Sequence, residues 1–257
     1  METKRVCLIT GAATGIGAAC AREFAAHGWQ LGLSYLDDAT HVHVLDVAAN
    51  CEALGASTLV QRLDVTSEAS CLAFSQAALQ RFGRIDALIN CAGTTRFIAH
   101  TDLDALDPQE FHRTYDVNTV GLYRMTRACV PALKASGHGS VVNISSIGGT
   151  IGRGSSMAYA ASKGAVNTLT LSLARALAPQ IRVNAIAPGF VEGGLPSRVL
   201  DAVRHAEVVQ TQTAASVLQR VSQPEEVAAL ACFLTERAPG MTGEVIQMDN
   251  GLHLNAG

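Results

Sequence analysis

The sequence has few charged and few aromatic residues, and it has no long apolar run. Of its 257 residues, 16% are charged and 5% are aromatic, whereas 48% are hydrophobic, and the net charge is −3. This composition excludes the disordered class, and without a basic stripe we expect no nucleic acid partner. No apolar stretch approaches the roughly 18 residues that cross a bilayer, and the run at 6–10 is too short for a signal peptide. We therefore expect a cytoplasmic protein without a membrane partner.

Paired cysteines are also missing from the sequence. The seven cysteines are odd in number and widely spaced, and no two of them form a Cys-x-x-Cys pair. This pattern argues against a disulfide framework and against a zinc site. We therefore expect reduced thiols and no metal.

Lysine is scarce, and its scarcity draws attention to one position. The chain has only Lys4, Lys134 and Lys163, and Lys163 stands four residues after Tyr159. On a helix this spacing puts both side chains on one face, where the ammonium favours the phenolate and lowers its pKa from about 10. Chance produces such a pair in roughly one chain in twenty of this composition, so its weight depends on other motifs.

Short apolar runs alternate with alanine-rich segments of helical period along the whole chain. This alternation predicts βαβ units and a parallel sheet with helices on both faces. No repeat or linker divides the sequence, so we expect one domain over 1–257, in which the long connection 188–222 has a functional role. The expected strands are 6–10, 31–35, 58–63, 87–90, 140–144, 182–186 and 244–248, and the expected helices are about 15–28, 39–54, 67–82, 108–135, 156–178 and 224–236.

A glycine-rich turn follows the first expected strand and precedes the first expected helix. Gly11, Gly15 and Gly17 stand in a Gly-x-x-x-Gly-x-Gly spacing. Glycines at such a turn let the backbone and the helix N-terminus approach a pyrophosphate. A tight turn that binds nothing is the alternative interpretation.

With this turn and the Tyr-x-x-x-Lys pair in one chain, the sequence resembles the short-chain dehydrogenase/reductase family over nearly its whole length. The resemblance implies a Rossmann-type doubly wound α/β domain with about seven parallel strands in the order 3-2-1-4-5-6-7. Five further segments resemble family motifs in the family's order: Leu-Asp-Val-Thr at 63–66, Asn-Cys-Ala-Gly at 90–93, Asp-Val-Asn-Thr-Val-Gly at 116–121, Asn-Ile-Ser-Ser at 143–146 and Arg-Val-Asn-Ala-Ile-Ala-Pro-Gly at 182–189.

The resemblance implies catalytic roles for four residues. Tyr159 would exchange the proton of the substrate oxygen, and Ser146 would hydrogen-bond that oxygen. Lys163 would lower the tyrosine pKa and bind the nicotinamide ribose, and Asn118 would hold a water that relays protons to Lys163. Ser146 is preferred over Ser145 because it has the family's distance of 13 residues before the tyrosine. For Asn118, the alternative is a satisfied amide in the core.

The resemblance also implies a nicotinamide dinucleotide as cofactor. Asp64 would hold the adenine, although it could instead cap the next helix. NAD enzymes place an acid at the end of the second strand, where this chain has Tyr35, so we favour NADP slightly over NAD, even though Asp37 and Asp38 lie close by. The expected cofactor-binding residues are Gly11, Thr14, Gly15, Ile16, Gly17, Ser34, Tyr35, Asp64, Val65, Asn90, Ala92, Gly93, Tyr159, Lys163, Pro188, Gly189 and Val191.

The segment after Pro188 and Gly189 departs from the family pattern. Family members often have a threonine there to bind the nicotinamide carboxamide, but this chain has Glu-Gly-Gly at 192–194. The backbone of Phe190 or Val191 is the expected replacement. The segment 188–222 is the expected substrate-side lid, and the rest of the pocket is expected to include Thr94, Arg96, Gly148, Ile151, Arg153 and Met157.

The implied activity is hydride transfer between the cofactor and a small carbonyl or secondary alcohol. A 3-oxoacyl thioester is the leading substrate class, and a sugar or polyol is the nearest rival. Sugar-nucleotide epimerases also use Tyr-x-x-x-Lys, but with another glycine spacing and a longer chain. A catalytically silent dinucleotide-binding regulator is the alternative of another class. Family members commonly form homotetramers, and the segment 248–251 resembles a part of one subunit interface.

Overall fold

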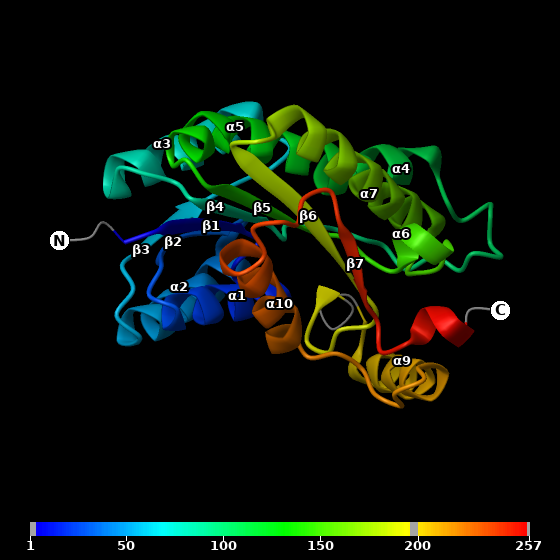
Figure 1. The fold of residues 1–257 in the computed structure, drawn as a ribbon. Coiled ribbons are helices and arrows are strands. Elements are labelled where there is room, and N and C mark those ends of the chain that lie inside the picture. The colour runs from blue at the N-terminus through cyan, green and yellow to red at the C-terminus, as the bar shows by residue number, and fades with distance from the viewer. Residues whose placement is uncertain (1–3, 196–199, 256–257) are drawn as a thin grey trace.

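A seven-stranded parallel sheet forms the centre of the protein in the computed structural model, which describes residues 4–195 and 200–255. The strands follow the order β3-β2-β1-β4-β5-β6-β7, so the expected Rossmann-type fold is confirmed. Figure 1 shows the strong twist of this sheet. The strands are β1 (Val6–Thr10), β2 (Gln30–Tyr35), β3 (Thr58–Arg62), β4 (Ala87–Asn90), β5 (Gly139–Ile144), β6 (Ile181–Pro188) and β7 (Val245–Met248).

Helices cover both faces of the sheet, as the continuous apolar runs of β1 and β4 predict. On one face lie α1 (Gly15–Ala26), α2 (Asp38–Ala53) and α10 (Pro224–Glu236), with Phe24 and Val227 fully buried between them and the sheet. On the other face lie α3 (Glu68–Phe82), α4 (Pro108–Tyr115), the π-helical turn η1 (Asp116–Gly121), α5 (Leu122–Ala135), α6 (Gly148–Ile151) and α7 (Met157–Leu177).

The parallel register brings the loops after β1, β4, β5 and β6 to one edge of the sheet. Thr10 pairs with Asn90, and Asn90 pairs with Asn143. Further along, Ile144 pairs with Ile186, and Pro188 pairs with Met248. The carboxyl ends of parallel strands are where α/β proteins bind ligands, so this edge is the place to look for a site.

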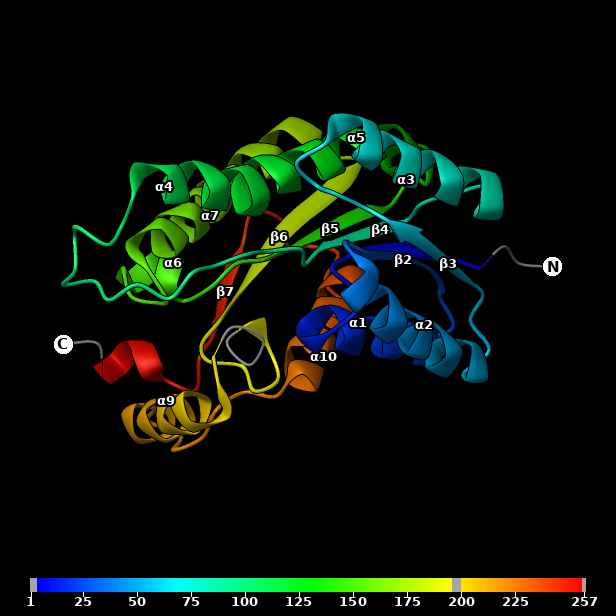
Figure 2. The same ribbon diagram turned by 180° about the vertical axis from the view of Figure 1, so that it is seen from behind.

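Helix α9 (Ala202–Ala215) differs from the other long helices because it does not cover the sheet. It lies beside the 3-10 helix η2 (Leu252–Asn255) near the C-terminus (Figures 1 and 2). No residue of α9 is buried. It lies within the expected lid 188–222 and forms 14 of its residues, and positions 196–199 of that segment lie outside the described residues.

The predicted strand boundaries agree with the structure within two residues, and one predicted helix needs correction. The stretch 108–135 is helical throughout, but a π-helical turn interrupts it at Asp116–Gly121. Such turns occur mostly at functional sites and leave no mark in helical periodicity. Within the described part of the chain, no helix is long and apolar enough to cross a membrane.

Candidate active site

The N-terminal half of α7 carries the tyrosine and lysine of the Tyr-x-x-x-Lys pair. Ser156 caps this helix, since its hydroxyl accepts a hydrogen bond from the Tyr159 backbone N–H at 3.2 Å. One turn later, the buried Lys163 donates from Nζ to the Ile144 carbonyl at the end of β5, at 2.7 Å. Its Nζ lies 5.7 Å from the centre of the Tyr159 ring. The lysine therefore joins α7 to the sheet edge while it remains next to the tyrosine.

The two neighbouring serines after β5 occupy different environments. Ser146 is half-buried, and its hydroxyl hydrogen-bonds the Tyr159 phenol. Ser145 is buried, and its hydroxyl donates to Asn167 Oδ1 at 2.6 Å, one turn of α7 beyond Lys163. Ser146 is therefore placed to touch a substrate oxygen beside the phenol, and Ser145 secures α7 against β5.

Burial controls the proton affinities of the pair. Burial raises the pKa of Tyr159 to about 12, although the hydrogen bond with Ser146 acts to lower this pKa. Burial also lowers the pKa of Lys163 to about 8. The Tyr159 shift is opposite to the depression expected from the sequence, because desolvation outweighs the hydrogen bond with Ser146. The phenol is consequently protonated at neutral pH.

Asn118 lies behind this pair on the π-helical turn η1, buried to 1% exposure. Its Oδ1 accepts from the Thr94 N–H at 2.8 Å, and its Nδ2 donates to the Thr94 carbonyl and to Ser162 Oγ, both at 3.0 Å. Ser162 Oγ in turn donates to the Tyr159 carbonyl at 2.7 Å. Asn118 thus joins the loop after β4 to α7, and the proton relay through it stays a prediction.

The turn between β1 and α1 has the geometry of an anion-binding site. Gly17 must lack a side chain, because a Cβ there would lie 2.2 Å from the Gly11 carbonyl oxygen. The first helical turn contains no acid, and Thr14 at the N-cap makes no side-chain hydrogen bond to it. Ile16, in that turn, packs against the core. The N–H groups at the start of α1 are therefore available to a phosphate group.

Gly93 lies close to both Asn118 and Lys163. A Cβ on Gly93 would lie 3.4 Å from Asn118 Oδ1 and 4.0 Å from Lys163 Nζ, so the loop after β4 passes beside these two side chains. Thr10 Oγ1 accepts from the N–H groups of Cys91 and Ala92, both at 3.0 Å, and so joins the end of β1 to this loop. Together with the β1–α1 turn, the residues present fit a dinucleotide that runs along the sheet edge.

Two expected cofactor residues have structural roles that the sequence did not reveal. The Asn90 side chain is buried, and its Nδ2 donates to Asn143 Oδ1 at 2.9 Å and to Thr126 Oγ1 at 3.0 Å. Ser34 is also buried, and its Oγ accepts from the Gly11 N–H at 3.1 Å. These side chains hold the strands and the glycine turn in place.

At the expected adenosine end, the structure adds a residue that the sequence analysis missed. Arg62, paired with Tyr35 in the sheet register, donates from Nε to the Leu36 carbonyl at 2.9 Å. Tyr35 stacks on His41 with ring centres 4.4 Å apart. Asp37 caps α2 by accepting from the Thr40 N–H at 2.9 Å. A strand-end arginine has no sequence signature, because only the register puts it beside Tyr35.

Asp64 and Val65 follow β3 at the same edge. Asp64 Oδ1 accepts from the Thr66 N–H at 2.9 Å, and Ser67 rather than Asp64 caps α3. The alternative that Asp64 caps that helix is therefore wrong. Val65 is buried and packs against Gly121 of η1.

The segment after β6 begins the expected lid. Pro188 ends β6, Gly189 donates to the Met248 carbonyl of β7 at 3.0 Å, and Val191 forms an isolated bridge with Ser222. The Phe190 carbonyl accepts from the Ser222 N–H, so it already has a partner. Glu192 is exposed and accepts from Gln223 Nε2 at 2.9 Å.

The expected pocket residues gather around the connection between β5 and α7. Gly148 donates its N–H to Ser146 Oγ at 3.1 Å, and the Arg153 carbonyl lies close above it. Ile98 donates to the Ser155 carbonyl at 2.8 Å and ties the loop after β4 to this connection. Thr94 is tied to Asn118, Met157 begins α7, Ile151 ends α6, and Arg96 is exposed.

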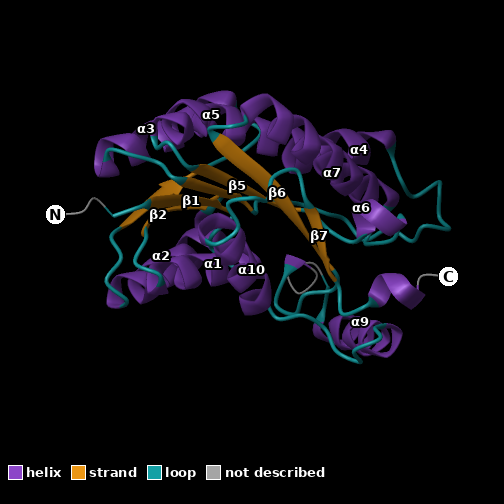
Figure 3. Ribbon diagram, viewed as in Figure 1, coloured by secondary structure: helices purple, strands orange, loops and turns teal. Residues whose placement is uncertain are grey.

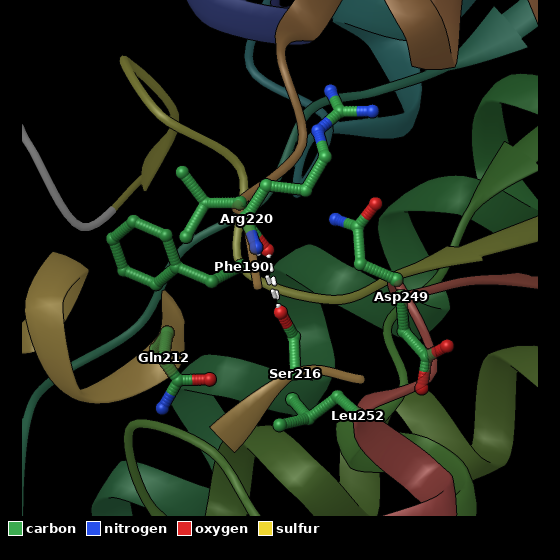
Figure 4. Close-up of a pocket in the computed structure, with 8 residues that line it drawn as sticks. Phe190, Gln212, Ser216, Arg220, Asp249 and Leu252 are labelled. Atoms are coloured by element: carbon green, nitrogen blue, oxygen red, sulfur yellow. Dashed lines mark hydrogen bonds between the residues drawn. The ribbon is translucent and has the colours of Figure 1, made fainter. Parts of the chain in front are cut away.

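Two hollows lie away from the catalytic candidates. Figure 4 shows the smaller one, where Ser216 Oγ donates to the Arg220 carbonyl at 2.8 Å and Phe190 lies on one side. Its volume of about 10 Å³ suits a single water molecule. The second, of about 460 Å³, is an open surface hollow lined by His112, Arg113, Tyr115, Asp116 and Val120.

Comparison with known proteins gives concordant results. A family model described as enoyl-(acyl carrier protein) reductase matches residues 11–253. A crystal structure from Burkholderia xenovorans, described as a short-chain dehydrogenase/reductase, is 51% identical, with a TM-score of 0.92, and the match covers 99% of this chain and 100% of that one.

Two curated relatives are similarly complete matches. Ketoacyl reductase 2 of the granaticin polyketide synthase of Streptomyces violaceoruber is 38% identical over 249 residues, which cover 97% of this chain and 96% of the relative. The 3-oxoacyl-(acyl-carrier-protein) reductase FabG of Thermotoga maritima is 34% identical over 250 residues, with 96% and 97% covered.

Proposed function

Because the chain belongs to the short-chain dehydrogenase/reductase family, we propose that this oxidoreductase reduces 3-oxoacyl thioesters with NADPH and uses Tyr159 as its proton donor. The family uses a nicotinamide dinucleotide, which supplies the hydride when it is bound. The names of two relatives, a ketoacyl reductase and a 3-oxoacyl reductase, support the substrate class.

The observation that carries the proposal is the protonated phenol of Tyr159 within a hydrogen bond of Ser146. Reduction of a carbonyl builds negative charge on its oxygen, which needs a proton donor and a second hydrogen-bond donor. Burial raises the pKa of Tyr159 to about 12, so the phenol holds its proton more firmly than an ordinary tyrosine does, and Ser146 lies beside it. Lys163, whose Nζ is held by the Ile144 carbonyl, lies next to the Tyr159 ring and close to Gly93.

The test is a reductase assay that follows the absorbance of reduced nicotinamide. Acetoacetyl thioesters serve as substrates, with sugars and polyols in the oxidising direction as the competing class. We expect turnover of the thioester, and we expect Tyr159→Phe to lower kcat about 10²–10⁴-fold because it removes the only transferable proton of that side chain. Faster turnover of the sugars or polyols overturns the substrate class, and a fully active Tyr159→Phe variant overturns the role of the tyrosine.

The preference for NADP rests on the end of β2. Arg62 supplies a cation next to Tyr35, whereas the Asp37 carboxylate is engaged at the start of α2. A ribose 2′-phosphate needs a cation at this end of the strand, and a 2′-hydroxyl needs an acid. We expect Arg62→Gln to lower kcat/KM for NADPH about 10–100-fold and to leave NADH use unchanged.

The exposed Arg81 on α3 offers a matched control, since Arg81→Gln removes an arginine on another helix. Equal use of NADH and NADPH by the wild type, or a preference for NADH, contradicts the NADP assignment. An unchanged cofactor ratio in Arg62→Gln removes the role of that residue.

Three further parts of the proposal concern organisation. We take 1–257 as one oxidoreductase domain, in which 188–222 forms the substrate-side lid. The Phe190 ring lies 6.0 Å from His205 of α9, so the lid helix reaches the segment that follows β6. We also propose a cytoplasmic homotetramer; no disulfide joins the cysteines of the described residues, which suits a reducing compartment. A light-scattering mass equal to one chain contradicts the tetramer.

A further inference from the structure

Four potential metal-binding side chains meet where α1 packs against α10, on the face of the sheet away from α7 (Figure 1). Glu23 and His27 stand four residues apart at the end of α1, and Cys232 and Glu236 stand four residues apart on α10. Each pair therefore lies on one side of its own helix. We call these four residues the α1–α10 cluster.

The two nitrogens of His27 face different carboxylates. His27 Nδ1 lies 2.9 Å from Glu236 Oε2, and His27 Nε2 lies 3.4 Å from Glu23 Oε1. Cys232 is buried at 2% exposure and completes the group, since the ligand atoms of Glu23, His27 and Cys232 all lie within 4.8 Å of one another. An oxygen, a nitrogen and a sulfur donor thus converge from two helices.

Glu236 is placed to orient His27 rather than to be a ligand itself. Its Oε1 accepts from Trp29 Nε1 at 2.8 Å and forms an ion pair with Arg5 at 2.5 Å, so the carboxylate is held on the inner side of the cluster. Metal-bound histidines commonly donate their other N–H to a carboxylate in this way. With Nδ1–H bound to Glu236, the lone pair of Nε2 faces Glu23.

We propose that Glu23, His27 and Cys232 bind a zinc-like divalent ion, with Glu236 as the positioning residue for His27. Zinc bonds of about 2.0–2.3 Å put tetrahedral ligands roughly 3.3–3.8 Å apart, which small side-chain rotations reach from the present separations. A thiolate and an imidazole favour zinc over magnesium or calcium. Glu23 and His27 side chains are 33% and 34% exposed, so the ion enters from solvent and a water completes its shell.

Binding of the ion would stabilise the contact between α1 and α10. Helix α1 begins at Gly15, in the turn that is available to a phosphate group, whereas α10 follows the lid segment. An ion held by both helices stabilises the folded chain, and this stabilisation grows with the logarithm of the ion concentration over its dissociation constant. This inference concerns a face without the catalytic candidates, so it stands or fails independently of the reductase proposal.

The test is a Co²⁺ titration of untagged, reduced, EDTA-treated full-length protein, followed by competition with Zn²⁺. We expect one Co²⁺ per chain, with a thiolate-to-cobalt charge-transfer band that Zn²⁺ abolishes. Zn²⁺ is also expected to raise the melting temperature in a scan. The absence of saturable binding, or a cobalt spectrum without the thiolate band, overturns the site.

Variants assign the ligands. His27→Gln changes a partly exposed side chain, and Cys232→Ser keeps the size of a buried one. We expect each of these two variants to weaken Co²⁺ binding more than about 100-fold. We expect Glu236→Gln to weaken it about 10–100-fold. The matched controls on α2, His43→Gln and Cys51→Ser, are expected to bind as the wild type does. Should Cys232→Ser and His27→Gln retain the wild-type affinity and band, the ion binds elsewhere and the proposal is wrong.

Discussion

Helix α7 carries the candidate catalytic pair and α9 lies in the proposed lid, and the two helices are built in opposite ways. Helix α7 buries nine of its 21 residues, and Lys163 ties it to β5. Helix α9 is 14 residues long and buries none. The core therefore determines where the reacting groups of α7 lie, whereas little in the core determines where α9 lies.

This difference matches the two roles proposed for the helices, proton transfer for α7 and substrate recognition for α9. A proton donor works when its surroundings fix its position and its proton affinity, and both require burial. A substrate-side helix must let molecules in and out, which suits an element with few buried contacts. We expect substitutions in α7 to affect rate and stability, and substitutions in α9 to affect neither strongly.

After Tyr159→Phe, the largest expected effect on the reaction comes from Ser146→Ala. This change removes a hydrogen-bond donor from the developing oxyanion, so we expect kcat to fall about 10²–10³-fold while the melting temperature stays near that of the wild type. Steady-state kinetics and a thermal scan measure the two quantities. The neighbouring Ser145→Ala is the control, because it removes a hydrogen bond to Asn167 instead and should lower stability more than rate. Equal rate losses in both variants would argue against the assignment of Ser146.

The next effect is on stability, from Leu173→Ala in the buried part of α7. Leu173 is 8% exposed, so we expect the free energy of unfolding to fall by about 2 kcal/mol from lost burial and a residual cavity. Urea denaturation measures this loss. Leu171→Ala, at a position 40% exposed on the same helix, should cost much less. Similar losses at the two positions would mean that α7 is less firmly packed than the structure indicates.

A smaller effect concerns pH and Lys163. Its pKa of about 8 in the folded chain lies below the ordinary 10.5, so between these values the unfolded chain holds a proton that the folded chain lacks. The free energy of unfolding therefore rises with pH in this window, by at most about 1.4 kcal/mol per pH unit from this group. The raised pKa of Tyr159 acts in the opposite sense only above about pH 10.

Urea denaturation at several pH values between 8 and 10 tests this contribution. We expect Lys163→Met to lack the part of the slope that the wild type owes to the lysine. Parallel pH profiles for the two proteins would show that the ammonium is not desolvated in the folded state.

The smallest effect is expected in α9. Val203 is 69% exposed, so Val203→Ser should change the free energy of unfolding by less than about 0.5 kcal/mol. Any change in the assay should appear in KM rather than kcat, because α9 contributes no reacting group. A stability loss comparable to that of Leu173→Ala would show that α9 is covered by something in solution, and the contrast between the two helices would fail.

Much of the fold was predictable because it depends on local patterns. The strand at 6–10 and the helix at 224–236 have the predicted boundaries, since apolar runs and a proline at the first helical position mark them directly. Strand β6 runs two residues further than predicted, to Pro188, because its last pair is with Met248 of β7. Pairing with a distant strand leaves no local mark.

The candidate site divides in the same way. The spacing of Tyr159 and Lys163 and the glycines of the first turn are readable, because each belongs to one continuous element. Other features could not be predicted from the sequence. These are the π-helical turn at Asn118, the buried amide of Asn90 and the buried hydroxyl of Ser34, because their partners come from other elements.

The sequence by itself determined the order of elements, the family and the pairing of a phenol with an ammonium, because these follow from periodicity and spacing along the chain. Only the tertiary structure decided that burial raises the pKa of the phenol, that the Ser145 hydroxyl is bonded to Asn167, and that Arg62 of β3 lies beside Tyr35 at the end of β2. It also brought Glu23 and His27 to Cys232, about 200 positions away in the chain. Burial and contact between distant segments depend on packing, which spacing along the chain does not encode.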